Sequence, residues 1–197
     1  MENGTFGAPK LNGLILTGGR STRMGRDKSQ LIYHGKPQRE HLTELLAPYC
    51  EAVFWSVNTE QAVELPTTDQ PLIIDLFDFP GPLNGILSAF THDSAAAWLV
   101  VACDMPLLTT RSLDALLRGR NLAKLATVFY DSDGQFPEPL LGIYEPAFHP
   151  VLKQAMIAEQ YSPRQALQQH DVQILTVPDI RELANVNDPA TKALLGL

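Results

Sequence analysis

The stretch from Leu14 to Lys28 limits the fold more than any other part of this chain. It begins with three consecutive apolar residues, Leu14, Ile15 and Leu16, and then breaks at Gly18 and Gly19. An apolar strand without polar alternation is typical of a parallel sheet that helices cover on both faces. Two glycines let the backbone turn sharply and let a ligand approach the amides that follow. We therefore predict an α/β fold whose first strand ends in an anion-binding loop.

Four cations follow these glycines, and they indicate what the loop would bind. They are Arg20, Arg23, Arg26 and Lys28. Guanidinium groups offer a planar fork of donors and an ammonium offers a compact charge, so together they suit a polyphosphate. A Walker loop does not fit, because Gly35-Lys36 precedes a proline, and the glycine spacing excludes the dinucleotide fingerprint. The plain alternative is a solvated, arginine-rich surface loop.

Length and composition point to one soluble domain. A chain of 197 residues can bury roughly 70% of the surface it exposes when unfolded, without a disulfide or structural metal. We expect residues 1–10 to form a loose tail, since they resemble no secretory signal, and residues 11–197 to form one domain. Two cysteines fit a reducing cytoplasm, where we place the protein. A net charge of -7 argues against a nucleic-acid-coating protein, and the apolar runs are too short for a membrane span.

Further strands and helices alternate along the chain. A helix after Pro37 has its apolar face at Leu42, Leu45, Leu46 and Tyr49. This alternation predicts a mostly parallel central sheet with helices on both faces. The predicted strands are 52–57, 72–74, 96–102, 125–130 and 172–177, and a helix is expected after Pro189. The segment 137–144 contains two prolines, which favours an edge strand or a bulge. The aspartates of the turn 131–134 are expected in solvent.

Acidic and amide side chains come directly after several of these strands. Asp104 follows the most apolar run, 96–102, and would lie in the crevice where open α/β sheets bind ligands. One carboxylate together with substrate phosphates suits Mg²⁺. The alternative role, capping the helix that begins near Thr110, would place Asp104 six residues too early. Gly81 and Gly85 open a helix, where they serve either ligand approach or packing alone.

The residues from 16 to 28 resemble a known signature. Leu-Thr-Gly-Gly-x-Ser-x-Arg-Met-Gly-x-Asp-Lys is similar to that of the molybdenum cofactor guanylyltransferases, the MobA family of nucleotidyltransferases. Five more stretches match in order: Gly35-Lys36-Pro37, Asp75 with Gly81-Pro82-Leu83-x-Gly85, Cys103-Asp104-Met105-Pro106, Pro137-Glu138-Pro139-Leu140 and Asn185-Val186-Asn187. The resemblance implies a single Rossmann-like nucleotidyltransferase domain. Thr17, where alanine is commoner, and Gln38-Arg39, where the family often has apolar residues, depart from the pattern.

The resemblance also implies a reaction, the transfer of GMP from GTP to the terminal phosphate of molybdopterin with release of pyrophosphate. The implied catalytic residues are Arg23, Lys28 and Asp104, with Mg²⁺ at Asp104. The implied GTP-binding residues are Leu16, Thr17, Gly18, Gly19, Lys28, Asn58, Asp75, Gly81, Gly85 and Asp104. Asn185 and Asn187 would face the pterin. Besides GTP and molybdopterin, a molybdoenzyme or a cofactor-biosynthesis protein is a possible partner.

Two other functions stay open from the sequence. The same scaffold supports cytidylyltransferases and sugar-nucleotide transferases, although Thr17-Gly18-Gly19 resembles the guanylyl group rather than the Leu-Ala-Ala-Gly of cytidylyltransferases. A nucleotide-binding module without turnover is the alternative outside the enzymes. Competition between purine and pyrimidine nucleotides would distinguish a guanylyltransferase from the other transferases. A turnover measurement would distinguish an enzyme from a nucleotide-binding module.

Overall fold

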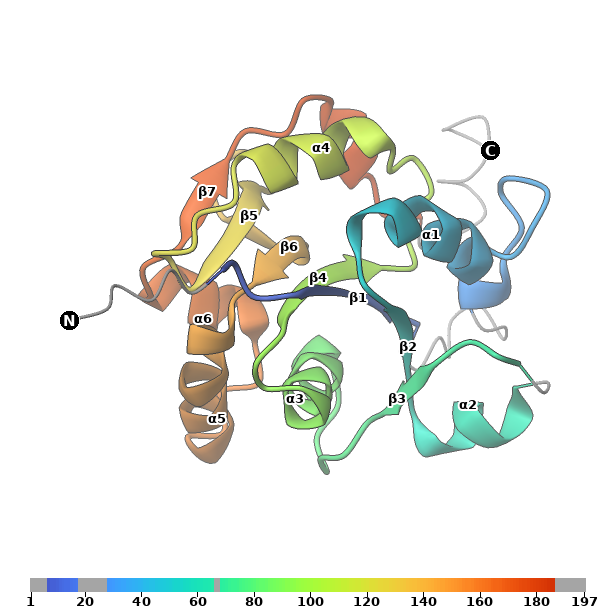
Figure 1. Ribbon diagram of the computed structural model, residues 1–197, viewed down its shortest axis with the longest axis horizontal. Helices are drawn as coiled ribbons and strands as arrows, with labels where there is room; N and C mark the ends of the chain where they lie inside the picture. The colour runs from blue at the N-terminus through green and yellow to red at the C-terminus, as the bar shows by residue number, and fades with distance from the viewer. Residues whose placement is uncertain (1–6, 18–27, 66–67, 187–197) are drawn as a thin grey trace.

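The computed structural model describes residues 7–17, 28–65 and 68–186. These residues form an α/β fold around a seven-stranded sheet with the order β3-β2-β1-β4-β6-β5-β7 (Figure 1). The strands are β1 (Leu11–Leu16), β2 (Val53–Val57), β3 (Leu72–Ile74), β4 (Ala97–Ala102), β5 (Ala126–Tyr130), β6 (Pro137–Tyr144) and β7 (Gln173–Leu175). The predicted apolar runs therefore all form strands. The run that the sequence marks as most apolar, β4, lies in the middle of the sheet and is buried throughout.

Strands β3, β2, β1 and β4 form a continuous parallel half of the sheet. In the register, Leu16 pairs with Ser56 on one side and with Ala102 on the other. On the outer side of β2, Val57 pairs with Ile74. Because these strands run in the same direction, the segments that follow Leu16, Val57, Ile74 and Ala102 all leave the sheet at one edge.

The other half of the sheet is built around an antiparallel strand. β6 lies between β4 and β5 and pairs with both in antiparallel fashion. Of the two alternatives predicted for 137–144, an edge strand or a bulge, the edge strand was therefore wrong. The bulge agrees with the β5–β6 pairing, which shifts register between Val128 and Tyr130. The position is possible because β6 pairs with β4 only from Leu141 to Tyr144, so Pro137 and Pro139 lie beyond that ladder.

Helices cover both faces of the sheet, as predicted. They are α1 (Gln38–Leu46), α2 (Thr59–Glu64), α3 (Pro82–His92), α4 (Thr110–Arg118), α5 (His149–Ile157) and α6 (Pro163–Gln169). The single-turn 3-10 helices are η1 (Lys28–Gln30), η2 (Ala47–Tyr49), η3 (Pro146–Phe148) and η4 (Ile180–Leu183). One apolar core joins α1 and α4 to the sheet and a second joins α3, α5 and α6 to its other face (Figure 1). Leu42 and Leu46 of α1 are fully buried in the first core.

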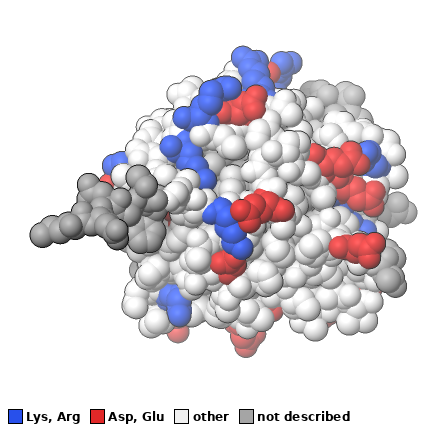
Figure 2. All heavy atoms as spheres, in the orientation of Figure 1, with Lys and Arg blue, Asp and Glu red and all other residues white. Residues whose placement is uncertain are grey.

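Charged side chains of both signs lie on the face drawn in Figure 2. In the part of the chain that the structure describes, most lysines and arginines pair with carboxylates. The pairs are Lys10–Asp93, Lys36–Glu44, Arg118–Asp114, Arg120–Glu145, Lys124–Asp171, Arg164–Asp131 and Arg181–Asp179. Of the described helices, none has the length and apolar content needed to cross a membrane.

Candidate active site

The first strand ends against its neighbour at Thr17, immediately before the glycine-rich segment. The Thr17 side chain donates a hydrogen bond of 2.6 Å from Oγ1 to the carbonyl of Ser56, and its backbone amide donates to the same carbonyl at 3.2 Å. The Gln61 side chain donates to the Thr17 carbonyl at 3.3 Å. Thr17 is buried. The Thr17 hydroxyl thus links the end of β1 to β2. Alanine, which is commoner at this position of the signature, cannot make this hydrogen bond.

Asn58 follows β2 and caps the next helix. Its Oδ1 accepts a hydrogen bond of 2.8 Å from the amide of Gln61, while the Gln61 side chain accepts one of 3.0 Å from the Asn58 amide. This reciprocal pair is a capping box. Because Oδ1 serves the helix, the Nδ2 group is the donor that this side chain would offer to a ligand.

Asp75 follows β3 and is partly withdrawn from water. Burial raises the pKa of its carboxyl to about 6, against the smaller opposing effect of the Ser56 hydroxyl, which donates to Oδ1 at 3.4 Å. The Asp75 amide donates to the Val57 carbonyl at 2.9 Å, so the residue is held at the end of the parallel sheet. A carboxylate that is incompletely solvated gains from a ligand that donates hydrogen bonds.

Asn84 holds the loop between β3 and α3, a role that the sequence analysis missed. Its Nδ2 donates to the carbonyls of Phe77 at 2.6 Å and Phe79 at 2.9 Å, and its Oδ1 accepts from the Phe77 amide at 3.2 Å. Ser88, one turn later, accepts from the Leu76 amide at 3.0 Å. Asn84 stands at the unspecified position of Gly81-Pro82-Leu83-x-Gly85, so the sequence signal was an amide in the first turn of a mostly apolar helix.

These segments enclose a cavity of about 550 Å³ at the carboxyl edge of the sheet. It is lined by Asn58, Thr59, Glu60, Asp75, Phe77, Asp78, Phe79, Pro80, Gly81 and Asn84. Three residues predicted to bind GTP, Asn58, Asp75 and Gly81, therefore line one space. Its aromatic wall was not predicted: Phe79 stacks on Tyr161 with ring centres 4.4 Å apart and lies 5.9 Å from Phe77.

The two glycines of the α3 start have different surroundings. Gly81 has a φ of +106°, which favours glycine, and open space where a Cβ would lie. At Gly85, in contrast, a Cβ would lie 2.3 Å from Ser56 Oγ and 2.8 Å from Leu16 Cδ2. Close packing of α3 on β1 and β2 is thus enough to explain Gly85, while Gly81 faces the cavity.

Asp104 lies one strand away, on the other side of β1 from the cavity. It is partly exposed in the loop 103–109, which we call the β4–α4 loop. Two side chains hold this loop just beyond Asp104: Gln38 donates to the Met105 carbonyl at 3.3 Å, and His34 Nε2 bonds the Pro106 carbonyl at 2.7 Å. Gln38, a departure from the family pattern, thus has a structural function.

Within the described residues, no three histidine, cysteine, aspartate or glutamate side chains form a metal cluster. Mg²⁺ commonly takes one or two carboxylates together with substrate phosphates and water, so it does not require such a cluster. The oxygen donor of Asp104 and its partial exposure fit such an ion.

A buried acidic pair lies near Asp104 on the antiparallel side. Arg164 of α6 contacts Asp131 at 3.0 Å and Glu138 at 3.5 Å. Burial raises the pKa of Glu138, and the negative charge of Asp104 contributes in the same direction. The expectation that Asp131 lies in solvent was wrong: only 6% of it is exposed, because its carboxylate accepts hydrogen bonds from the turn amides as well as from Arg164.

Asn185, predicted to face the pterin, lies exposed at the end of the described chain. The next residue, Val186, donates its amide to the Asp104 carbonyl at 2.8 Å, so the structure brings this segment to the β4–α4 loop. Several predicted residues lie outside the described residues, namely Gly18, Gly19, Arg20, Arg23, Arg26 and Asn187. The side chain of Lys28 and the helix expected after Pro189 also lie outside them.

A parallel half-sheet, a cavity at its carboxyl edge and an acidic residue at the same edge, in the loop after β4, define a nucleotide-binding α/β protein of the nucleotidyltransferase class. The comparison with family models agrees, since residues 13–174 match the MobA-like NTP transferase domain. The chain belongs to this family of nucleotidyltransferases.

Similar proteins fall in the same group. A molybdenum cofactor guanylyltransferase of Pseudomonas putida is 34% identical over 92% of this chain and 95% of its own length. A molybdenum cofactor biosynthesis bifunctional protein of Synechocystis is also 34% identical, but the chain spans only about half, 52%, of that protein. Molybdopterin-guanine dinucleotide biosynthesis protein A of Archaeoglobus fulgidus has the same fold, with a TM-score of 0.78, 24% identity and coverage of 93% and 95% of the two chains.

Proposed function

We propose that this chain transfers GMP from GTP to the terminal phosphate of molybdopterin and releases pyrophosphate. The observation that carries the proposal is the convergence of Asn58, Asp75 and Gly81 on one cavity beside the exit of β1. The name of the Pseudomonas putida relative, molybdenum cofactor guanylyltransferase, supports the choice of reaction.

Asp75 is proposed to select the base. An ionised carboxylate presents two acceptors, which match the two donors on the Watson–Crick edge of guanine, N1–H and the amino group. Cytosine offers acceptors at the corresponding positions and would face the carboxylate unfavourably. A site that pairs its buried polar groups with the correct base can reject a wrong one by as much as about 10⁴-fold.

The reaction joins two anions, so catalysis rests on positioning and on neutralised charge rather than on a protein nucleophile. An oxygen of the pterin phosphate forms a bond to the α-phosphorus of GTP while the bond from that phosphorus to the β-phosphate breaks, and pyrophosphate leaves with the electron pair. We assign Arg23 and Lys28 to the triphosphate by their charge and place in the sequence. Asn185 and Asn187 are assigned to the pterin side.

We assign Mg²⁺ to Asp104. When bound there, the cation would neutralise phosphate charge. Asp104 itself holds its place through the β4–α4 loop, whose carbonyls at Met105 and Pro106 are fixed by Gln38 and His34. The preceding residue, Cys103, donates its amide to the Leu16 carbonyl at 3.2 Å, so the loop of Asp104 begins beside the end of β1, where the phosphates would lie.

The test is pyrophosphate release from GTP, CTP or ATP in the presence of Mg²⁺, with and without molybdopterin. Release that requires both GTP and molybdopterin supports the proposal. Preference for CTP would move the protein to the cytidylyltransferases, and binding without release would make it a nucleotide-binding module. Asp104→Asn should lower the rate at least about a hundredfold, since it removes a charge in contact with the metal; unchanged turnover would overturn the assignment of Asp104.

A further inference from the structure

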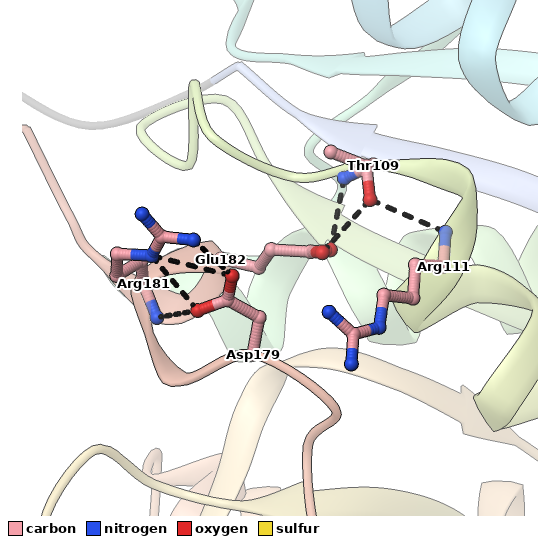
Figure 3. A network of polar contacts seen from close by, with 5 residues as sticks. All are labelled: Thr109, Arg111, Asp179, Arg181 and Glu182. Carbon is pink, nitrogen blue, oxygen red and sulfur yellow. Dashed lines mark hydrogen bonds and ion pairs between the residues drawn. The ribbon is translucent and has the colours of Figure 1, made fainter.

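The last described segment of the chain is fastened to the β4–α4 loop by a buried carboxylate. Glu182 of η4 accepts two hydrogen bonds from Thr109, one from the backbone amide at 3.0 Å and one from the hydroxyl at 2.8 Å (Figure 3). Only 4% of Glu182 is exposed. Thr109 is also the N-cap of α4, so the negative charge lies at the positive end of that helix.

A second contact joins the same two segments at the proposed metal ligand. The Val186 amide donates to the backbone carbonyl of Asp104, as described above, and the side chains of Leu183 and Val186 are buried, with 4% and 1% exposed. The segment 182–186 is therefore tied to the β4–α4 loop at both of the loop's ends. Asn185 lies within this tied segment, one residue before the amide that bonds Asp104.

A neighbouring ion pair shows by contrast why Glu182 matters. Asp179, the N-cap of η4, and Arg181 bond each other, and the side-chain contacts of this pair do not extend to the β4–α4 loop (Figure 3). The Arg181 side chain is 76% exposed. This pair stabilises the turn locally, whereas Glu182 links segments 73 residues apart in the chain.

We infer that Glu182 is a positioning residue that fixes the spacing between Asp104 and Asn185. The inference rests on the proposed function, in which Asp104 serves the nucleotide phosphates and Asn185 serves the acceptor. Loss of the link would let the acceptor-side segment move relative to the nucleotide side. Small displacements of this kind cost as much as about a hundredfold in rate, because the reacting groups lose alignment.

The test separates positioning from folding by measuring the kinetics of both substrates. Glu182→Gln leaves one acceptor for two donors. We expect kcat to fall about tenfold or more and the KM for molybdopterin to rise about tenfold, while the KM for GTP stays within about twofold. Thr109→Val should also raise the KM for molybdopterin, because valine lacks the hydroxyl. Thr109→Ser should keep this KM near the wild-type value, since serine keeps the hydroxyl. Arg181→Ala is the matched control and should leave both KM values unchanged.

Hydrogen exchange at the Val186 amide provides a readout that does not depend on activity. Glu182→Gln should accelerate exchange at Val186 about tenfold or more, because opening of the 182–186 segment becomes easier, whereas Arg181→Ala should not. A variant that loses thermal stability but raises neither the molybdopterin KM nor the exchange rate would overturn the inference. If wild-type protein turns over a different acceptor or nucleotide, the proposed function fails, while the exchange result still decides whether the link exists.

Discussion

Asp75→Asn should make the protein more stable and less able to bind GTP. Burial raises the pKa of this carboxyl from 3.8 to about 6, so the folded state disfavours the ionised form. One pKa unit corresponds to about 1.4 kcal/mol, which gives about 3 kcal/mol for this displacement. Because the carboxyl is partly exposed, water screens it and reduces this free-energy penalty to about 1–2 kcal/mol. For a chain of this length, the gain corresponds to about 3–6 °C in Tm.

The sign of the pH dependence follows from the direction of the shift. Below about pH 4 the carboxyl is protonated in both the folded and the unfolded states, so the variant gains nothing there. Between about pH 4 and pH 6 the folded protein retains a proton that the unfolded chain has lost, and the stability of the wild type falls as pH rises. The full advantage of Asp75→Asn is expected above about pH 7.

Thermal unfolding from pH 4 to pH 8 measures this effect, and GTP titration measures the functional cost. We expect GTP affinity at pH 8 to fall at least about tenfold, because asparagine replaces one of two acceptors by a donor that faces the guanine donors. Asp78→Asn is the matched control, since Asp78 lines the same cavity but is exposed. A stability gain that persists at pH 4, or no gain at pH 8, would refute the reasoning.

Three further substitutions test the packing around the site. Gly85→Ala places a methyl group 2.3 Å from Ser56 Oγ and should lower the free energy of unfolding by about 2 kcal/mol, as measured by chemical denaturation. This loss should be smaller in a Ser56→Ala background. Equal losses in the two backgrounds would contradict the steric cause. Glu145→Gln breaks a mostly buried ion pair with Arg120, whose two contacts are 2.7 and 2.9 Å long. The substitution should lower the free energy of unfolding by about 3 kcal/mol. A loss below about 1 kcal/mol would show that the pair is solvated. Phe79→Ala removes the middle ring of the aromatic wall and should weaken GTP binding at least about threefold in the same titration, whereas unchanged affinity would place the nucleotide away from this wall.

Local sequence patterns were sufficient to predict the strands of this fold and several of its helices, although α5 was not predicted. The apolar runs of β1 and β4 are buried on both sides, as a covered parallel sheet requires, and the Leu42 and Leu46 spacing gives α1 its buried face. A side chain placed directly after a buried strand, such as Asp104, could be predicted to lie at the carboxyl edge of the sheet, because parallel strands end at the same edge. These features depend on periodicity and on burial, which neighbouring residues encode.

Pairings between distant segments could not be predicted in the same way. The place of β6 inside the sheet follows from its register with β4 and β5, and the burial of Asp131 follows from Arg164, which is 33 residues away. The role of Asn84 likewise depends on its hydrogen bonds to the loop before α3, which its place in the sequence does not indicate.

What the sequence by itself determined is therefore the α/β class, the glycine-rich signature and most of the residues assigned to the nucleotide. The tertiary structure alone decided that Asn58, Asp75 and Gly81 share a cavity, and that Glu182 ties the acceptor-side segment to the loop of Asp104. The physical reason is that periodicity and turn chemistry act within a few residues. A hydrogen bond across 73 residues instead depends on how all the intervening elements pack.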